Sequence, residues 1–256
     1  MAELLGPELT IYGKSFLMIF LRIGIFMLML PFFASKAFPA QFKIGLAVSL
    51  ALVLTPIVKP MMVTQNILIV IAKEVILGML LGLSVRTIFM AVNMAGQLMS
   101  YSMGMSMATV YDPEYGQSAE ISRLFGIIIM LIFFALDVHH ELIYLFARSF
   151  EILPIGEINI SNMLQLGINS GSMVFIMAIK IASPIMVGMA VASLLFGYMY
   201  KAAPQINIFF VSYPVYIFVG FIIIILSMPV FFNFITVSFE QMKTDMYKVL
   251  VTAGVK

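Results

Sequence analysis

The chain of 256 residues contains no cysteine, and only 10% of its residues are Asp, Glu, Lys or Arg. Without cysteine it can form no disulfide framework, thiolate metal site or cysteine nucleophile. A charged fraction of about 25% is usual in soluble proteins, so this chain has too little charge to cover a surface that faces water. The composition therefore excludes a soluble cytosolic enzyme.

Basic residues are also too few to form a face for nucleic acid. Fourteen Lys and Arg stand against 12 Asp and Glu, whereas phosphate backbones need clustered positive charge. The first nine residues carry Glu3 and Glu8 but no basic residue, unlike the start of a cleavable signal peptide. Tryptophan is absent, so aromatic anchors at a membrane interface are expected from the ten tyrosines. We expect no binding to nucleic acid and no cleavage of the first apolar segment.

Apolar residues make up 62% of the chain and gather in long stretches. A helix that crosses the roughly 30 Å hydrocarbon core needs about 20 such residues. Pro184, Pro214 and Pro229 lie inside apolar stretches, where each is expected to kink a helix. We predict an all-α, polytopic membrane-associated protein of bent, Pro-kinked helices, forming one domain over residues 1–256 with no separate soluble domain. The expected helices cover residues 10–33, 44–58, 67–110, 122–150, 171–200 and 206–238.

Several charged residues fall inside these expected helices, and each must be buried in protein, paired or in contact with water. They are Lys14, Arg22, Lys73, Glu74, Arg86, Asp137, Glu141 and Lys180. The Lys and Arg residues of the connections divide almost evenly between the two sides, so they do not decide the orientation. The tail from Glu240 carries Lys243, Lys248 and Lys256 and is expected in the cytoplasm.

No group of residues predicts covalent chemistry. Gly13-Lys14-Ser15 resembles the end of a phosphate-binding loop, but the first glycine of that motif would fall at Glu8. Potential metal ligands stand close together at Asp137, His139, His140 and Glu141. They form no HExxH motif, so a polar helix segment near water is favoured over a metal site. With no GxSxG nucleophile elbow either, we predict a protein that is not an enzyme and holds no metal or cofactor.

Small residues recur every four positions in the expected helix 67–110. One stripe consists of Glu74, Gly78, Gly82 and Arg86, and a second of Gly96, Ser100, Gly104 and Ala108, beside Met99, Met103 and Met107. Small residues let helices approach closely in lipid, and flexible methionines suit a surface that seals around changing contents. Ordinary helix packing, with Met in place of Leu, is the alternative. The second stripe ends at Asp112-Pro113, where a helix is expected to stop.

Motifs along nearly the whole chain occur in an order typical of one family. They are Arg22, Pro31-Phe32, Pro39, Lys43 and Pro56; Glu74, Gly78, Gly82 and Arg86; Ala95-Gly96-Gln97, Met103-Gly104, Ala108 and Asp112-Pro113; His139-His140, Ser149-Phe150 and Pro154-Ile155-Gly156; and Gly197, Ala203-Pro204-Gln205-Ile206-Asn207-Ile208-Phe209, Pro214 and Gly220. In these motifs the chain resembles FliR of the flagellar protein export gate, whose injectisome relative is called SctT. One departure is Asp137-Val138-His139, where relatives often have Asn-Gly-His.

The resemblance implies a non-enzymatic subunit that assembles with FliP and FliQ into a helical pore in the bacterial inner membrane, at the flagellar basal body. FlhB, FlhA and membrane lipid are further expected partners, and unfolded flagellar proteins are the expected export substrates. It also implies bent helical hairpins built into a heteromeric spiral, much of it outside the bilayer. The segment Met105 to Gln117 is implied to help plug the closed pore.

Two sets of site residues follow from the stripes and the resemblance. The candidates for the plug or gate are Met99, Met103, Gly104, Met105, Met107, Ala108, Asp112, Pro113 and Gly116. The candidates for contacts between subunits are Glu74, Gly78, Gly82, Arg86, Gly96, Pro204, Gln205 and Asn207.

Three alternatives remain open at this point. The first is an injectisome subunit of the SctT type, although Ala203, and Gly220 after Pro214, favour FliR. A small-solute secondary transporter would place charged residues such as Glu74 or Arg86 in a midplane site, but the sequence shows no inverted repeat. A structural scaffold without pore contact would differ only in whether the methionine stripe faces a channel.

Overall fold

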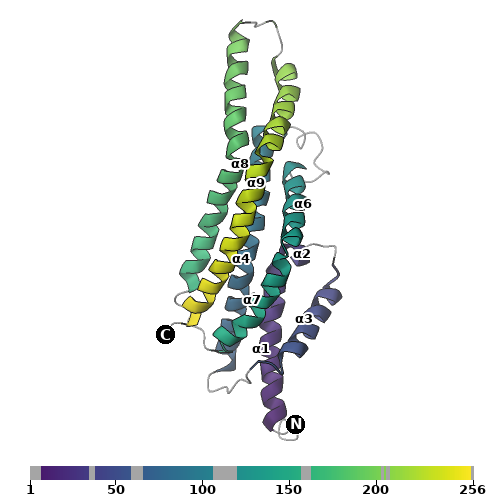
Figure 1. Ribbon diagram of the computed structural model, residues 1–256, viewed down its shortest axis with the longest axis vertical. Coiled ribbons are helices and arrows are strands. Elements are labelled where there is room, and N and C mark those ends of the chain that lie inside the picture. Colours follow the sequence, from purple (N-terminus) through teal and green to yellow (C-terminus); the bar gives the residue numbers. More distant parts are fainter. Residues whose placement is uncertain are drawn as a thin grey trace. The chain divides into compact units, whose positions relative to one another are not determined.

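The computed structural model describes residues 7–34, 38–58, 66–105, 120–156, 163–202, 205 and 208–254, and the regular structure in these ranges is entirely helical. The helices, drawn in Figure 1, are α1 (Pro7–Met29), α2 (Pro31–Ala34), α3 (Ala40–Leu54), α4 (Ile67–Ser102), α6 (Glu120–Ala135), α7 (Val138–Ile152), α8 (Met163–Ala202) and α9 (Ile208–Gly254). The prediction of an all-α chain is confirmed.

Long apolar helices dominate the described ranges. Those long and apolar enough to cross a membrane are Ile11–Met29 within α1, Ile67–Ser102, Gly167–Ala202 and Phe210–Gly254. Helices α6 and α7 together would make a further span with a break between them, whereas α3 is a shorter apolar helix. The chain is therefore a polytopic membrane protein, as predicted. All six expected apolar segments contain helix, but the second of them holds only α3.

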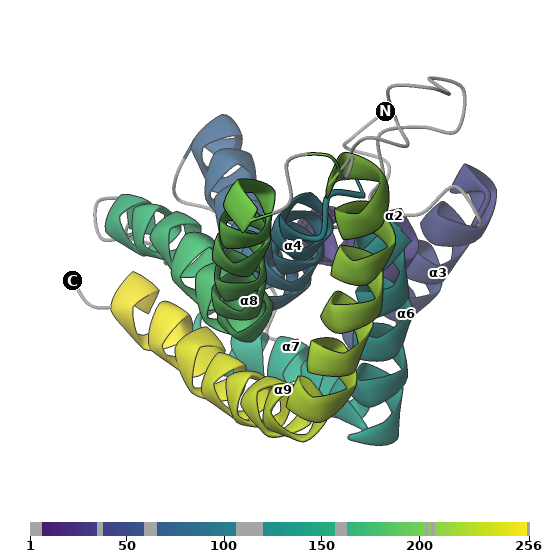
Figure 2. The same cartoon turned by 90° about the horizontal axis from the view of Figure 1, so that it is seen from above.

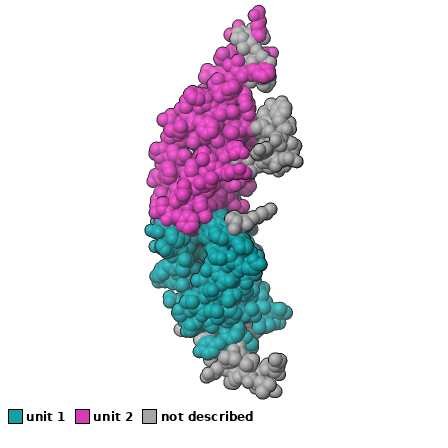
Figure 3. Space-filling model, turned by 90° about the vertical axis from the view of Figure 1, so that its right-hand side faces the viewer, with its two compact units in different colours: residues 1–87, 137–171, 240–256 teal, residues 88–136, 172–239 magenta. Residues whose placement is uncertain are grey.

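The chain divides into two compact units, coloured in Figure 3. Unit 1 consists of residues 1–87, 137–171 and 240–256, and unit 2 of residues 88–136 and 172–239. The boundaries fall inside α4, α8 and α9 and between α6 and α7. Contacts within a unit therefore join residues that are distant along the chain.

In unit 1, α1 packs against α3, α7 and the first part of α4. Helix α3 runs beside α1 in Figure 1. Phe26 of α1 stacks on Phe146 of α7, with ring centroids 4.7 Å apart. Ile19 and Ile23, four residues apart on α1, are buried together with Leu77 of α4. One apolar face of α1 thus forms the centre of this unit.

In unit 2, α6 and α8 both lie beside α9. Phe125 of α6 meets Phe231 of α9 edge to face with centroids 4.9 Å apart, and Phe196 of α8 meets Tyr216 of α9 in the same way at 5.2 Å. Figure 2 shows α9 next to both helices. Such aromatic pairs contribute about 0.5–1.5 kcal/mol beyond the area they bury, so they fix the register of α9 against both neighbours.

Helices α8 and α9 continue through their internal prolines. Pro184 lies inside α8, and Pro214 and Pro229 lie inside α9. A proline leaves the carbonyl four residues earlier without its backbone partner. In α8 that carbonyl belongs to Lys180, and it accepts a hydrogen bond from the Ser183 hydroxyl at 2.9 Å. A neighbouring side chain thus replaces the missing bond, as membrane helices commonly require.

Several helix boundaries differ from the expectation. The expected helix 122–150 is two helices, because Asp137 adopts φ 52° and interrupts the hydrogen-bond ladder. Helix α8 begins at Met163, in a stretch expected to be a connection. The expected tail after Glu240 is helical to Gly254, since Met246 and Leu250 are buried four residues apart and Glu240 pairs with Lys243 at 3.1 Å. Its side of the membrane stays a prediction.

Candidate functional site

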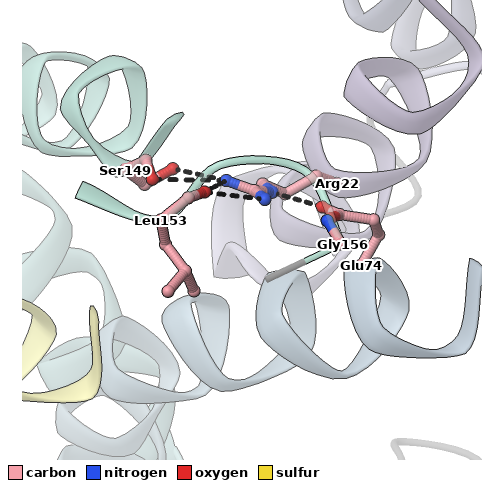
Figure 4. Close-up of polar contacts among 5 residues, drawn as sticks. All are labelled: Arg22, Glu74, Ser149, Leu153 and Gly156. Carbon is pink, nitrogen blue, oxygen red and sulfur yellow. Dashed lines mark hydrogen bonds and ion pairs between the residues drawn. The ribbon is translucent and has the colours of Figure 1, made fainter. Parts of the chain in front are cut away.

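Arg22 lies in the apolar centre of unit 1, and its side chain is fully buried. Its Nε donates to Oε2 of Glu74 in α4 at 2.6 Å, and the Glu74 side chain is also fully buried. The two residues are 52 positions apart in the sequence, and their side chains meet between α1 and α4 (Figure 4). A buried charge is tolerated only with a partner, so this ion pair ties α1 to α4.

The rest of the Arg22 guanidinium binds the carboxyl end of α7. Nη1 donates to the carbonyl and the hydroxyl of Ser149 at 3.4 and 3.3 Å, and both Nη1 and Nη2 donate to the Leu153 carbonyl at 3.3 Å. The guanidinium carbon lies 4.2 Å from the centre of the Phe150 ring. The Ser149 carbonyl also accepts the Leu153 N–H at 3.0 Å, whereas the Leu153 carbonyl lies beyond the helix end, where carbonyls lack intrahelical partners and carry partial negative charge. Arg22 therefore caps α7 while it neutralises Glu74.

The turn after α7 is held to α4 by a second set of bonds. The Gly156 N–H donates to Oε1 of Glu74 at 3.1 Å, and Nζ of Lys73 donates to the Gly156 carbonyl at 3.0 Å. Gly156 has φ 87°, a conformation in which a side chain would be strained. Both peptide groups of this glycine thus face consecutive residues of α4. Arg22, Glu74, Ser149, Leu153 and Gly156 are named the polar cluster below.

Gly78 and Gly82 continue the same face of α4, where α1 approaches closely. A Cβ atom on Gly78 would stand 2.8 Å from the Arg22 carbonyl oxygen, and one on Gly82 would overlap Cβ of Met29. Nη1 of Arg86 lies 3.7 Å from the Met29 sulfur. We expected Glu74, Gly78, Gly82 and Arg86 to contact another subunit. The structure places α1 of the same chain against this stripe.

In unit 2, α4 ends in a C-cap and not at the expected Asp112-Pro113. Gly104 has φ 75°, its N–H donates to the Tyr101 carbonyl at 3.1 Å, and the Met105 N–H donates to the Ser100 carbonyl at 3.0 Å. This pair of bonds with a left-handed glycine is a Schellman motif. The expectation that Gly104 belongs to a stripe on a continuous helix to residue 110 was wrong. Gly104 instead provides the left-handed backbone conformation that ends the helix after Ser102.

Met99 and Met103 are packed inside unit 2. Met103 is fully buried, and its side chain fills the space over Gly220 of α9, where a Cβ would lie 2.5 Å from the Met103 Cε. Met99 is 2% exposed and lines a small pocket of about 60 Å³ with Phe125 and Lys180 among other residues. Neither thioether is presented to a channel within the described residues. Gly96 also packs internally, since its Cβ would meet the backbone of Ser122 at the start of α6.

Some predicted site residues lie outside the described residues. These are Met107, Ala108, Asp112, Pro113 and Gly116 of the plug candidates, and Pro204 and Asn207 of the assembly candidates. Gln205 is described and exposed, and Met105 is half-buried. The structure therefore brings Glu74 and its glycines together with α1, and separately brings Met99 and Met103 together with α9.

Sequence comparison places these features in a known family. Residues 14–242 match the family described as Bacterial export proteins, family 1. The chain belongs to this export family. Similar proteins include the flagellar biosynthetic protein FliR of Bacillus subtilis (strain 168), 29% identical over 252 residues that cover 94% of this chain and 96% of the relative. FliR of Pectobacterium carotovorum subsp. carotovorum is 30% identical over 228 residues, 87% of each chain. The predicted membership of the FliR family is confirmed.

The polar cluster joins three motifs by which the chain resembled these export proteins. In the sequence these are separate motifs, at Arg22, at Glu74 and from Ser149 to Gly156, and only Glu74 was predicted to make a contact between subunits. The expectation that Arg22 and Glu74 are buried or paired is confirmed. Ser149 and Leu153 were missed, although the sequence held a signal. Leu153 directly precedes Pro154, and Ser149 lies one turn earlier. A helix is expected to end before a proline, and its last carbonyls then need donors.

Proposed function

We propose that this chain is a non-enzymatic subunit of the flagellar protein export gate. In this proposal it assembles with FliP and FliQ in the bacterial inner membrane, at the flagellar basal body, and the complex forms the pore for unfolded flagellar proteins. FlhB and FlhA are further partners. Family membership supports an export role, and the similar proteins named above carry flagellar names, which favours the flagellar over the injectisome system.

The main support for assembly with other subunits is the length of apolar surface that unit 2 leaves exposed. Large exposed apolar side chains run from Phe210 to Val237 on α9 and from Met173 to Tyr200 on α8. At 1.5 Å per residue each stretch is about 40 Å long, whereas the hydrocarbon core is about 30 Å thick. A tilt of 20°, typical of membrane helices, shortens the stretch only to about 38 Å. The remaining apolar surface needs protein to cover it.

Coexpression tests this proposal directly. The chain carries an affinity tag, FliP and FliQ from the same organism carry none, and the complex is purified in mild detergent and weighed by native mass spectrometry. We expect a stable heteromer that contains all three proteins. A secondary transporter would be purified alone or as a homo-oligomer, and that result would refute the proposal.

The closing element in this proposal is the segment Met105 to Gln117. It directly follows the Schellman end of α4, and Met99 and Met103 before it are anchored in unit 2. The anchored helix end gives the segment a fixed origin. We propose that it obstructs the idle pore.

Deletion of Ser106 to Tyr111 should leave assembly intact and make cells permeable to ions or small solutes. The measurement is membrane conductance, or uptake of a small dye, in cells that express the three subunits. The matched control is the Met103→Leu variant, which keeps the segment. An assembled complex with the deletion that is as tight as wild type would place the seal elsewhere.

A further inference from the structure

The amino end of α7 carries a group of side chains with the composition of a metal site. Asp137, His139 and His140 each offer one ligand atom, and these atoms lie within 4.8 Å of one another. Two imidazoles and one carboxylate are a ligand set of zinc sites that keep an open position. All three residues belong to unit 1, and none takes part in the polar cluster.

The distances within the group fit a single small ion. Oδ1 of Asp137 and Nδ1 of His140 are 3.4 Å apart. Zinc binds nitrogen and carboxylate oxygen at about 2.0–2.2 Å in tetrahedral geometry, which places two ligand atoms on one ion roughly 3.3–3.5 Å apart. The observed pair already has this separation. All three ligand atoms lie within 4.8 Å of one another, so the third must come at most about 1.4 Å closer to match the 3.4 Å separation of the first two.

The backbone of Asp137 is a second, independent observation. Asp137 is the only non-glycine residue with positive φ in the described ranges, at 52°. It stands at the N-cap position of α7, yet its carboxylate makes no capping hydrogen bond and approaches the imidazole of His140 instead. Side-chain exposures of 73% and 71% make this ion pair weak. Asp adopts this left-handed conformation more readily than most residues, and here it places the carboxylate beside His140.

Local electrostatics permit a cation here. A helix amino end carries about half a positive charge, which disfavours a metal ion. Asp137 at the N-cap and Glu141 in the first turn of α7 place two carboxylates here, and their negative charge outweighs the helix dipole. The His139 and His140 rings lie close together, with centroids 4.0 Å apart and planes 39° apart, so one ring must turn for both nitrogen lone pairs to meet one ion.

The sequence favoured a polar helix segment over a metal site at these residues, but on the geometry we propose that Asp137, His139 and His140 bind one late first-row divalent metal ion, with zinc as the preferred ion and a water or a partner side chain as the fourth ligand. Asp137 and His140 are exposed and His139 is half-buried, so an ion can reach the site from outside the chain. Binding stabilises the left-handed Asp137 and the first turn of α7, because the ion binds the folded arrangement and not the unfolded chain.

The test uses the full chain, purified in detergent with a tag that contains no histidine and stripped with a chelator. Cobalt(II) is titrated in as a spectroscopic probe, and zinc then competes it away. We expect saturation at one equivalent, intense visible bands of a tetrahedral ion, and a rise in melting temperature with zinc. His140→Ala and Asp137→Asn should each weaken cobalt binding about tenfold or more, since even the loss of an outer-shell partner costs roughly 10–100-fold.

Glu151→Gln is the matched control, because Glu151 is exposed near the other end of α7 and lies outside the ligand group. It should bind cobalt like the wild type. His140 and Asp137 are exposed, so circular dichroism of both variants is expected to match the wild type. Absence of saturable binding by the wild type, or equal binding by the wild type and the two ligand variants, would overturn the site.

Discussion

Removal of one charge from the Arg22–Glu74 pair should destabilise unit 1 in a graded way. Breaking a buried ion pair from one side typically costs about 3–5 kcal/mol. Glu74→Gln keeps an oxygen that can accept from the Gly156 N–H and leaves Arg22 among the α7 carbonyls, so we expect a loss near ~3 kcal/mol. Arg22→Leu strands the Glu74 charge and uncaps α7, so we expect a loss near ~5 kcal/mol.

The free energy of unfolding in mixed detergent micelles, followed by far-UV circular dichroism, measures these losses. Arg22→Leu combined with Glu74→Leu should cost clearly less than the sum of the single changes, because no unpaired charge remains. Lys14→Gln is the control, since Lys14 lies on the same helix but is exposed. If Glu74→Gln stays within about 0.5 kcal/mol of that control, or if the two single changes simply add, the ion pair does not hold α1 and α4 together.

Three further predictions concern close packing, the end of α4 and an exposed charge. Gly82→Ala should destabilise the single chain by about 1–3 kcal/mol in the same assay, because the new Cβ overlaps Met29; Gly126→Ala, with open space at its Cβ, should be neutral or stabilising. Gly104→Ala should cost about 1–2 kcal/mol through its left-handed backbone, and Gly104→Asn clearly less. Lys180→Met should leave the folded chain unchanged but lower the yield of heteromer on native gels, because an exposed lysine on an apolar helix needs water or a partner; an unchanged yield would place Lys180 in water.

The sequence predicted which segments are helical better than it predicted where they end. Apolar length alone identifies a membrane helix, and every expected segment contains a helix, although α3 in the second is too short to span. The end of α4 depends on one left-handed glycine, and Gly104 looked like a member of a stripe because Gly96 and Ser100 precede it at the same spacing. Likewise Asp137 breaks the expected helix 122–150 through its own φ, although neither Gly nor Pro stands there to signal a break.

The buried charges show where reasoning from one sequence stops. The cost of a charge in an apolar helix required a partner for Arg22, but not its identity, because Glu74 is 52 residues away and Ser149 is 127 residues away. The glycine stripe likewise required a closely packed helix without saying whose helix it was. The structure answers both questions. Arg22 of α1 pairs with Glu74 of α4, and the same face of α1 packs against the glycines of α4. The stripe of α4 therefore packs against a helix of its own chain. The long apolar surfaces of α8 and α9 stay exposed among the described residues, and in the proposed complex they are the surfaces against which partner subunits would pack.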